Sequence, residues 1–226
     1  MKIKNLLFPA FILFIISCKK TSETSPPPPQ DTYLTTTTGS TWSYHQTDFS
    51  GVTPISTDYT VTSSSKDTLI NARSYHIFNL STGDYQYLSL SGNDYYQLDS
   101  LPAGLGIGVF ERLYLKDNVN IGTTWTQSLS VTIPGVPIPV PVTLTYTIAE
   151  KGISRTVNST NYTDVIHVST AVSSSLIPSA SFTSNINSYY AKKYGLIENS
   201  TIVNLDYSGI VENVNVETTL ISATLL

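Results

Sequence analysis

The chain contains only one cysteine, Cys18, so no disulfide can form within it and the fold depends on its own core. Charged residues make up only 12% of the 226 residues, and no basic stripe is present, which argues against binding to nucleic acid. Its longest apolar run, residues 6–16, is shorter than the roughly 20 residues of a membrane-spanning helix. No window of a dozen residues combines helical periodicity with helix caps, so helices are not expected.

Motifs for catalysis and cofactor binding are also lacking. The chain has no Gly-x-Ser-x-Gly nucleophile elbow, and Cys18, as the predicted lipidation site, is not available as a nucleophile. No catalytic residue, metal site or cofactor is therefore predicted. The histidines are too far apart in sequence to form a metal-ligand motif, and we expect them on the solvent face of strands; they are His45, His76 and His167.

Carboxylates could still be brought together by the fold, since glycoside hydrolysis depends on their separation in space. The candidates stand in no informative pattern and are expected to form turns or surface charges; they are Asp94, Asp99 and Glu111. A hydrolase with dispersed carboxylates is retained as a second alternative function.

The first 18 residues have the pattern of an export signal. Two lysines precede the apolar run, and Ile15-Ile16-Ser17-Cys18 resembles a bacterial lipobox, in which the cysteine is acylated. We predict a signal peptide over 1–17 and lipidation at Cys18. The remaining 209 residues carry 10 basic and 16 acidic side chains.

A lipid-anchored protein of this kind belongs in the bacterial cell envelope, and the outer membrane is the expected location. The residues after the cysteine, Lys19 and Lys20, are not the acidic residues of a surface-export signal, which favours the periplasmic face. The expected partners are the membrane, through the anchor, and an apolar or neutral ligand or another envelope protein.

Two segments follow the signal. Residues 18–32 include four consecutive prolines and predict a stiff tether. Residues 33–226 alternate between apolar and polar positions, with Gly-containing turns between the alternating stretches. We predict a single all-β domain with a dozen or more short strands.

A weak internal repeat divides this domain at about 33–121 and 122–226. Gly39-Ser40-Thr41-Trp42 recurs as Gly122-Thr123-Thr124-Trp125, and Tyr59-Thr60-Val61 recurs as Tyr146-Thr147-Ile148. The predicted fold is therefore an antiparallel curved sheet, barrel or half-barrel built from two similar units, with two stacked β-sandwiches as the alternative.

The lipobox, the proline tether, the Gly39-x-x-Trp42-x-Tyr44 opening and the phrase over residues 189–197 together resemble uncharacterised envelope lipoproteins of the Bacteroidota type. More broadly, the architecture is similar to open-barrel lipoproteins that carry or shield lipid. This resemblance implies an antiparallel β scaffold but does not by itself imply a function.

The segment over residues 131–142 contains four prolines and no charge, so it cannot be a regular central strand. It is either an exposed lip that meets a ligand or partner, or a plug over an open end of the sheet. Its candidate contact residues are Ile133, Val136, Ile138 and Val140.

Aromatic residues are abundant, with 15 tyrosines, and at strand spacing they are expected to form core contacts and cross-strand pairs. We expect Trp42 and Trp125 to be buried. Exposed, coplanar rings would instead favour a carbohydrate-binding module, which is the first alternative. The favoured function is a non-enzymatic binding or carrier lipoprotein.

Overall fold

The computed structural model describes residues 31–100, 109–132, 138–207 and 209–226. In these residues, twelve strands form one antiparallel sheet, with a 3₁₀ turn, Ser179–Ser181, before β10. The strands are β1 Thr41–Asp48, β2 Ile55–Ile70, β3 Arg73–Leu80, β4 Tyr85–Ser91, β5 Asp94–Ser100, β6 Val109–Lys116, β7 Thr124–Val131, β8 Val140–Val157, β9 Thr160–Ser174, β10 Phe182–Ala191, β11 Gly195–Tyr207 and β12 Ile210–Thr224.

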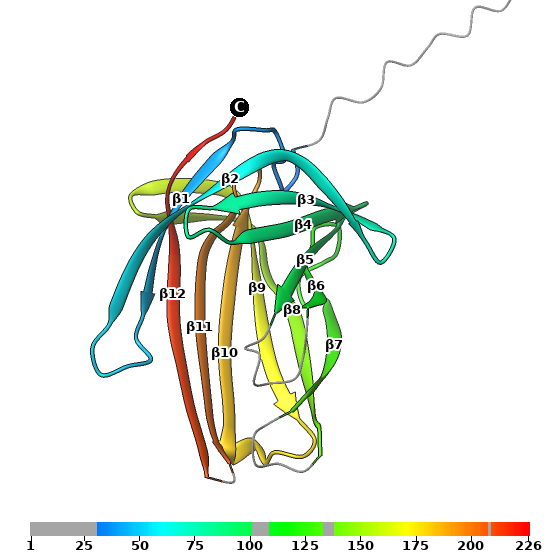
Figure 1. The fold of residues 1–226 in the computed structure, drawn as a ribbon, viewed down its shortest axis with the longest axis vertical. Coiled ribbons are helices and arrows are strands. Elements are labelled where there is room, and N and C mark those ends of the chain that lie inside the picture. The colour runs from blue at the N-terminus through cyan, green and yellow to red at the C-terminus, as the bar shows by residue number, and fades with distance from the viewer. Residues whose placement is uncertain (1–30, 101–108, 133–137, 208) are drawn as a thin grey trace, which may run out of the picture. The chain divides into compact units, whose positions relative to one another are not determined.

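The sheet consists of two meanders, β1–β6 and β7–β12, joined by pairing of the first strand with the last. The strand order is β6-β5-β4-β3-β2-β1-β12-β11-β10-β9-β8-β7. The sheet curls until its two end strands approach each other, so that the described residues form a nearly closed barrel (Figure 1). The predicted all-β curved sheet is confirmed, and the described residues do not form two stacked sandwiches.

Alternation along the strands explains which face of the sheet is buried. In β1, Trp42 and Tyr44 are only 5% and 8% exposed, whereas their neighbours Ser43 and His45 are more accessible. Because successive strand residues point to opposite faces, this alternation directs the aromatic rings into the barrel.

The two halves begin with the same turn. Gly39 and Gly122 both have positive φ, +88° and +82°. Each donates its backbone N–H to the following long strand, to Ser63 O at 2.9 Å in the first half and to Ile148 O at 2.8 Å in the second. A left-handed conformation suits glycine, which explains why this residue recurs at both positions.

The turns between β2 and β3 and between β8 and β9 also match. Each has a two-residue loop in which both residues have positive φ: Asn71 and Ala72 at 49° and 64°, and Asn158 and Ser159 at 47° and 68°. Such turns fit the right-handed twist of a hairpin and usually contain Asn followed by Gly. Here the second position holds Ala72 in the first half and Ser159 in the second, in place of the usual glycine.

The segment before β1 places Tyr33 inside the barrel, whereas its residues 36–39 are exposed. The Tyr33 ring is 4% exposed, and its hydroxyl donates a 2.8 Å hydrogen bond to Asp164 O. Tyr95 OH accepts from the Tyr33 N–H at 3.2 Å and donates to Asp117 at 2.6 Å. This segment therefore links the first half of the sheet to the second.

The second turn residue gives a direct test of strain in both halves. Replacing Ala72 by glycine should raise the free energy of unfolding by about 1 kcal/mol, because left-handed backbone is unfavourable for a residue with a Cβ. Ser159→Gly should have the same effect. Chemical denaturation of both variants measures the change. Ser74→Gly, in regular strand conformation in β3, is the control and should instead lose about 0.5–1 kcal/mol.

Candidate ligand cavity

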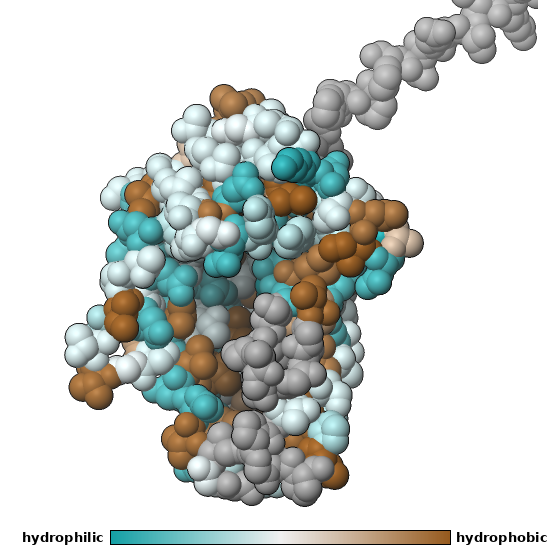
Figure 2. Space-filling model, in the orientation of Figure 1, coloured by the Kyte–Doolittle hydropathy of each residue, from teal (hydrophilic) through white to brown (hydrophobic). Residues whose placement is uncertain are grey.

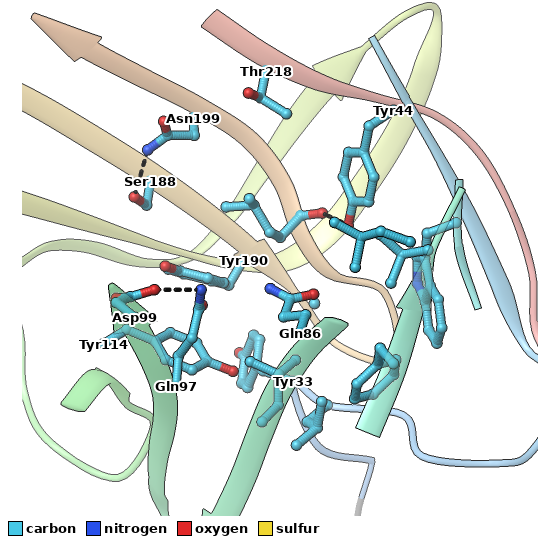
Figure 3. A pocket seen from close by; sticks show the side chains of 18 of the residues that line it. Tyr33, Tyr44, Gln86, Gln97, Asp99, Tyr114, Ser188, Tyr190, Asn199 and Thr218 are labelled. Atoms are coloured by element: carbon cyan, nitrogen blue, oxygen red, sulfur yellow. Dashed lines mark hydrogen bonds between the residues drawn. The ribbon is translucent and has the colours of Figure 1, made fainter. Parts of the chain in front are cut away.

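The barrel contains a cavity of about 580 Å³ that is partly open to solvent, and this volume is within the usual size range of small-molecule sites. Both halves of the sheet contribute to its wall, together with the segment before β1 (Figure 3). Tyrosine is the most frequent lining residue: the seven are Tyr33, Tyr44, Tyr59, Tyr85, Tyr114, Tyr190 and Tyr194. A hollow is visible on the face of the molecule shown in Figure 2.

One end of the cavity is apolar. Here β1, β2 and β3 place Trp42, Val61 and Phe78 in the wall, and the Trp42 and Phe78 rings meet edge to face with centroids 5.8 Å apart. Tyr44 stacks on Tyr59 at 5.4 Å and donates its hydroxyl hydrogen bond to Leu196 O at 2.9 Å. Because the Tyr44 hydroxyl is already hydrogen-bonded, it is mainly the aromatic ring that Tyr44 presents to the cavity at this end.

The other end is polar and is built around an ion pair between Asp99 on β5 and Arg112 on β6. Arg112 Nε donates to one carboxylate oxygen, and Gln97 Nε2 donates to the other at 2.7 Å. The side chains of Arg112 and Asp99 are 30% and 22% exposed, because both border the cavity. Across from them, Asn199 donates to Ser188 Oγ at 2.9 Å (Figure 3).

Arg112 and Asp99 are the only charged residues among the described residues that line the cavity. Burial lowers the pKa of the Arg112 guanidinium, but the Asp99 charge and nearby tyrosines raise it by more, so Arg112 stays protonated. The two charges neutralise each other. The cavity is therefore electrically neutral overall, although it contains strong hydrogen-bonding groups.

Four buried tyrosine hydroxyls of the wall also remain neutral. Burial raises the pKa of Tyr44, Tyr114 and Tyr190 above the ordinary value, and it raises that of Tyr33 to about 12, with smaller contributions from Asp164 and Asp117. At neutral pH these groups can donate and accept hydrogen bonds but carry no charge.

The barrel seam, where β6 meets β7, is held by side chains rather than by strand pairing. Trp125 Nε1 donates to Leu113 O at 2.8 Å, and Gln127 Nε2 donates to Glu111 O at 2.5 Å. The Trp125 ring also stacks on Tyr146, with centroids 5.4 Å apart and planes 10° apart. These bonds satisfy carbonyl groups of an otherwise open sheet edge.

The tryptophan prediction is confirmed for Trp42 and only partly for Trp125, which is half-buried at this seam. Neither ring belongs to a flat exposed platform. Tyr85 is exposed on β4, but its ring is tilted by 48° from that of Tyr87, so the two are not coplanar. Among the described aromatic pairs, these contacts do not resemble a surface platform for sugars.

The solvent-face expectation is wrong for His76, which lies on the same face of β3 as the buried Phe78. His167 lies on the face of β9 opposite the buried Ile166 and Val168, but Tyr189 stacks on its ring there. The side chains of His76 and His167 are only 13% and 12% exposed, and each contacts a carboxylate on the neighbouring strand. His76 Nδ1 is 2.7 Å from Asp67, and His167 Nδ1 is 3.0 Å from Glu150. His45 is more exposed. No group of three potential metal ligands occurs in the described part of the chain.

Sequence reasoning missed a Ser63–His76–Asp67 arrangement. Ser63 Oγ lies 2.8 Å from His76 Nε2, on the opposite side of the ring from Asp67, which is the order found in serine hydrolases. Ser63 is only 1% exposed, however, and its hydroxyl donates to Thr36 O at 2.9 Å. None of the three lines the cavity. This arrangement stabilises the bulge in β2 rather than presenting a nucleophile.

The candidate carboxylates are each neutralised by a cation. Asp94 pairs with Lys116, Asp99 with Arg112 and Glu111 with Arg73. Of the three, only Asp99 lines the cavity. They therefore do not form a pair of facing carboxylates there.

The proline-rich segment connects β7 to β8, and its candidate residues differ in environment. Val140 is 1% exposed and packs with Val131 and Ile177, as expected of a plug. Ile138 is 55% exposed, as expected of a lip. Ile133 and Val136 lie outside the described residues, as does Cys18.

No protein-family model and no curated protein sequence matches this chain. Among solved structures, it is similar to the crystal structure of a Bacteroides fragilis protein described as exported and as having a YMCC-like fold. The identity is 7% and the TM-score 0.43, over 86% of this chain and 100% of the other. In the described residues, no helix is long and apolar enough to cross a membrane.

The seam bonds lead to a prediction for Trp125. Trp125→Phe keeps an aromatic ring against Tyr146 but removes the N–H that bonds Leu113 O, so the free energy of unfolding should fall by about 1 kcal/mol. Amide hydrogen exchange in β6 and β7 should become faster. The exposed neighbour Thr126→Ala serves as the control and should stay within about 0.5 kcal/mol of the parent. If Trp125→Phe and Thr126→Ala lowered the free energy of unfolding equally, the Trp125–Leu113 hydrogen bond would not be what stabilises the seam.

Proposed function

We propose that this protein is a non-enzymatic envelope lipoprotein that binds a small apolar or neutral ligand inside its barrel. The observation that supports ligand binding is the 580 Å³ cavity, in which aromatic walls surround a few convergent polar groups. Such a combination is typical of small-molecule sites, where apolar contact supplies affinity and polar groups fix orientation.

Extracytoplasmic anchoring rests on the sequence. The basic residues, the apolar run and the lipobox-like Ile15-Ile16-Ser17-Cys18 support acylation at Cys18. More than one acyl chain makes such anchoring stable. The prolines over residues 26–29 would then separate the barrel from the membrane surface.

The absence of catalysis is part of the proposal and is supported by the side chains in the cavity. Asp99 is held by Arg112 and Gln97, so its carboxylate is already occupied as a hydrogen-bond acceptor. Ser63 contacts His76 in the way that a serine-hydrolase nucleophile contacts its histidine, but Ser63 does not line the cavity. Binding without turnover fits this arrangement.

Filling the cavity should abolish ligand capture. Thr218, on β12, is 8% exposed and points into the cavity (Figure 3). Thr218→Phe should weaken binding of the neutral fluorescent probe N-phenyl-1-naphthylamine at least about tenfold, equivalent to about 1.4 kcal/mol, because the new ring occupies ligand volume. Fluorescence titration measures the dissociation constant.

The matched control is Thr224→Phe, the same substitution at an exposed position of the same strand, which should bind the probe like the parent. Thermal unfolding of both variants verifies that the barrel is intact. If the parent shows no saturable binding, or if the folded Thr218→Phe protein binds equally well, the cavity is not a ligand site.

Anchoring is tested separately. Cys18→Ala removes the acyl acceptor, so the expressed full chain should leave the membrane fraction and lose the mass of the attached lipid. Fractionation and mass spectrometry provide the two measurements. Membrane association and mass unaffected by the substitution would contradict the lipoprotein assignment.

A further inference from the structure

The charged residues in the cavity wall restrict the chemistry of the ligand more closely than the volume of the cavity does. Arg112 and Asp99 are bonded to each other, and they are the only charged residues in the described wall. The bond to Asp99 uses one of the five N–H donors of Arg112, so an anionic head at the remaining donors would lie beside the Asp99 carboxylate and be repelled by it. A cationic head at Asp99 would lie beside the Arg112 guanidinium and be repelled in the same way. Either charged head would also lose hydration in a confined site.

Neutral hydrogen-bonding groups, by contrast, have unused capacity. The side chains of Gln86, Tyr114 and Thr218 line the cavity and form no hydrogen bond with another described residue. Gln86 points toward the centre of the cavity, as Figure 3 shows. Amides and hydroxyls both donate and accept, so a ligand hydroxyl or carbonyl would complement them.

The polar and apolar groups occupy different ends of the cavity. Gln97, Asp99 and Arg112 gather at one end, while Trp42 and Phe78 form the wall at the other. A ligand that is polar throughout would leave its groups unpaired beside the aromatic rings. A wholly apolar ligand would cover the ion pair and the amides without forming hydrogen bonds. Each arrangement loses the free energy of the unmade contacts.

We propose that the ligand is a neutral amphiphile, whose hydroxyl- or carbonyl-bearing head binds at the Gln97–Asp99–Arg112 end and whose apolar part packs against Trp42 and Phe78. This inference rests on the proposed function and specifies the ligand class for the same cavity. The head does not displace the ion pair but bonds to the amide and hydroxyl groups around it.

Three probes with the same eight-carbon chain test the neutrality of the head: octyl glucoside, octyl sulfate and octyltrimethylammonium. Each is titrated below its micelle-forming concentration in competition with N-phenyl-1-naphthylamine. Octyl glucoside should bind at least about tenfold more tightly than either charged probe. If a charged probe binds as well or better, the neutral-head inference is wrong while cavity binding stands. If neither N-phenyl-1-naphthylamine nor any octyl probe binds, the proposed function itself fails.

Two substitutions should change this selectivity in opposite directions. Asp99→Asn removes the counter-charge of Arg112, so octyl sulfate should gain at least about tenfold relative to octyl glucoside. Arg112→Gln leaves Asp99 unpaired and should favour octyltrimethylammonium in the same way. An unchanged ratio in both folded variants would show that the ion pair does not determine selectivity.

Asp94→Asn is the matched control. Asp94 and Lys116 form a comparable ion pair between the same two strands, with side chains 30% and 23% exposed, but neither lines the cavity. The probe ratios should therefore stay at the parent values. A shift as large as that of Asp99→Asn would attribute the effect to general loss of charge and would overturn the assignment to the cavity pair.

Discussion

The pairing of β1 with β12 is the interaction on which the rest of the structure depends. It joins residues 168 to 183 positions apart, in a ladder that runs from Thr41 opposite Thr224 to Asp48 opposite Val216. Each half is a meander of neighbouring strands and could form from local contacts, whereas this ladder requires closure of a very long loop. Without it, the two meanders would not share an interior. The opposite junction, between β6 and β7, has only side-chain bonds and so cannot replace it.

The sequence allowed the fold class to be predicted because the signals for it are local. Alternation around Trp42 and Tyr44 identifies the buried face, and the recurrence of Gly39 at Gly122 marks a turn whose positive φ favours glycine. The arrangement of the cavity could not be predicted in the same way. The Asp99–Arg112 pair depends on the register of β5 against β6, and in the sequence each residue is an ordinary polar residue in a strand.

The same limit explains why the surroundings of the histidines and of the proline-rich segment could not be predicted. Alternation places His76 and His167 on particular faces but does not show that Asp67 and Glu150 lie beside them, because bulges in β2 and β8 shift the register there. The composition of the proline-rich segment allows either a plug or a lip over its whole length, yet Val140 is buried and Ile138 is exposed. Only Pro139 lies between these two residues, and apolar composition does not distinguish their environments.

Departures from the internal repeat give the cavity its two ends. Strands β4–β6 and their counterparts β10–β12 both contribute polar groups: Gln97 and Arg112 from the first set, and Ser188, Asn199 and Thr218 from the second. The apolar end has no such balance. Trp42, Val61 and Phe78 come from β1–β3, whereas the corresponding strands β7–β9 contribute no residue to the described wall. Two exact copies would have produced a cavity with equivalent walls. Because β7–β9 do not line the described cavity, the apolar wall lies on one side only, and a ligand with one polar and one apolar part has a single favourable orientation.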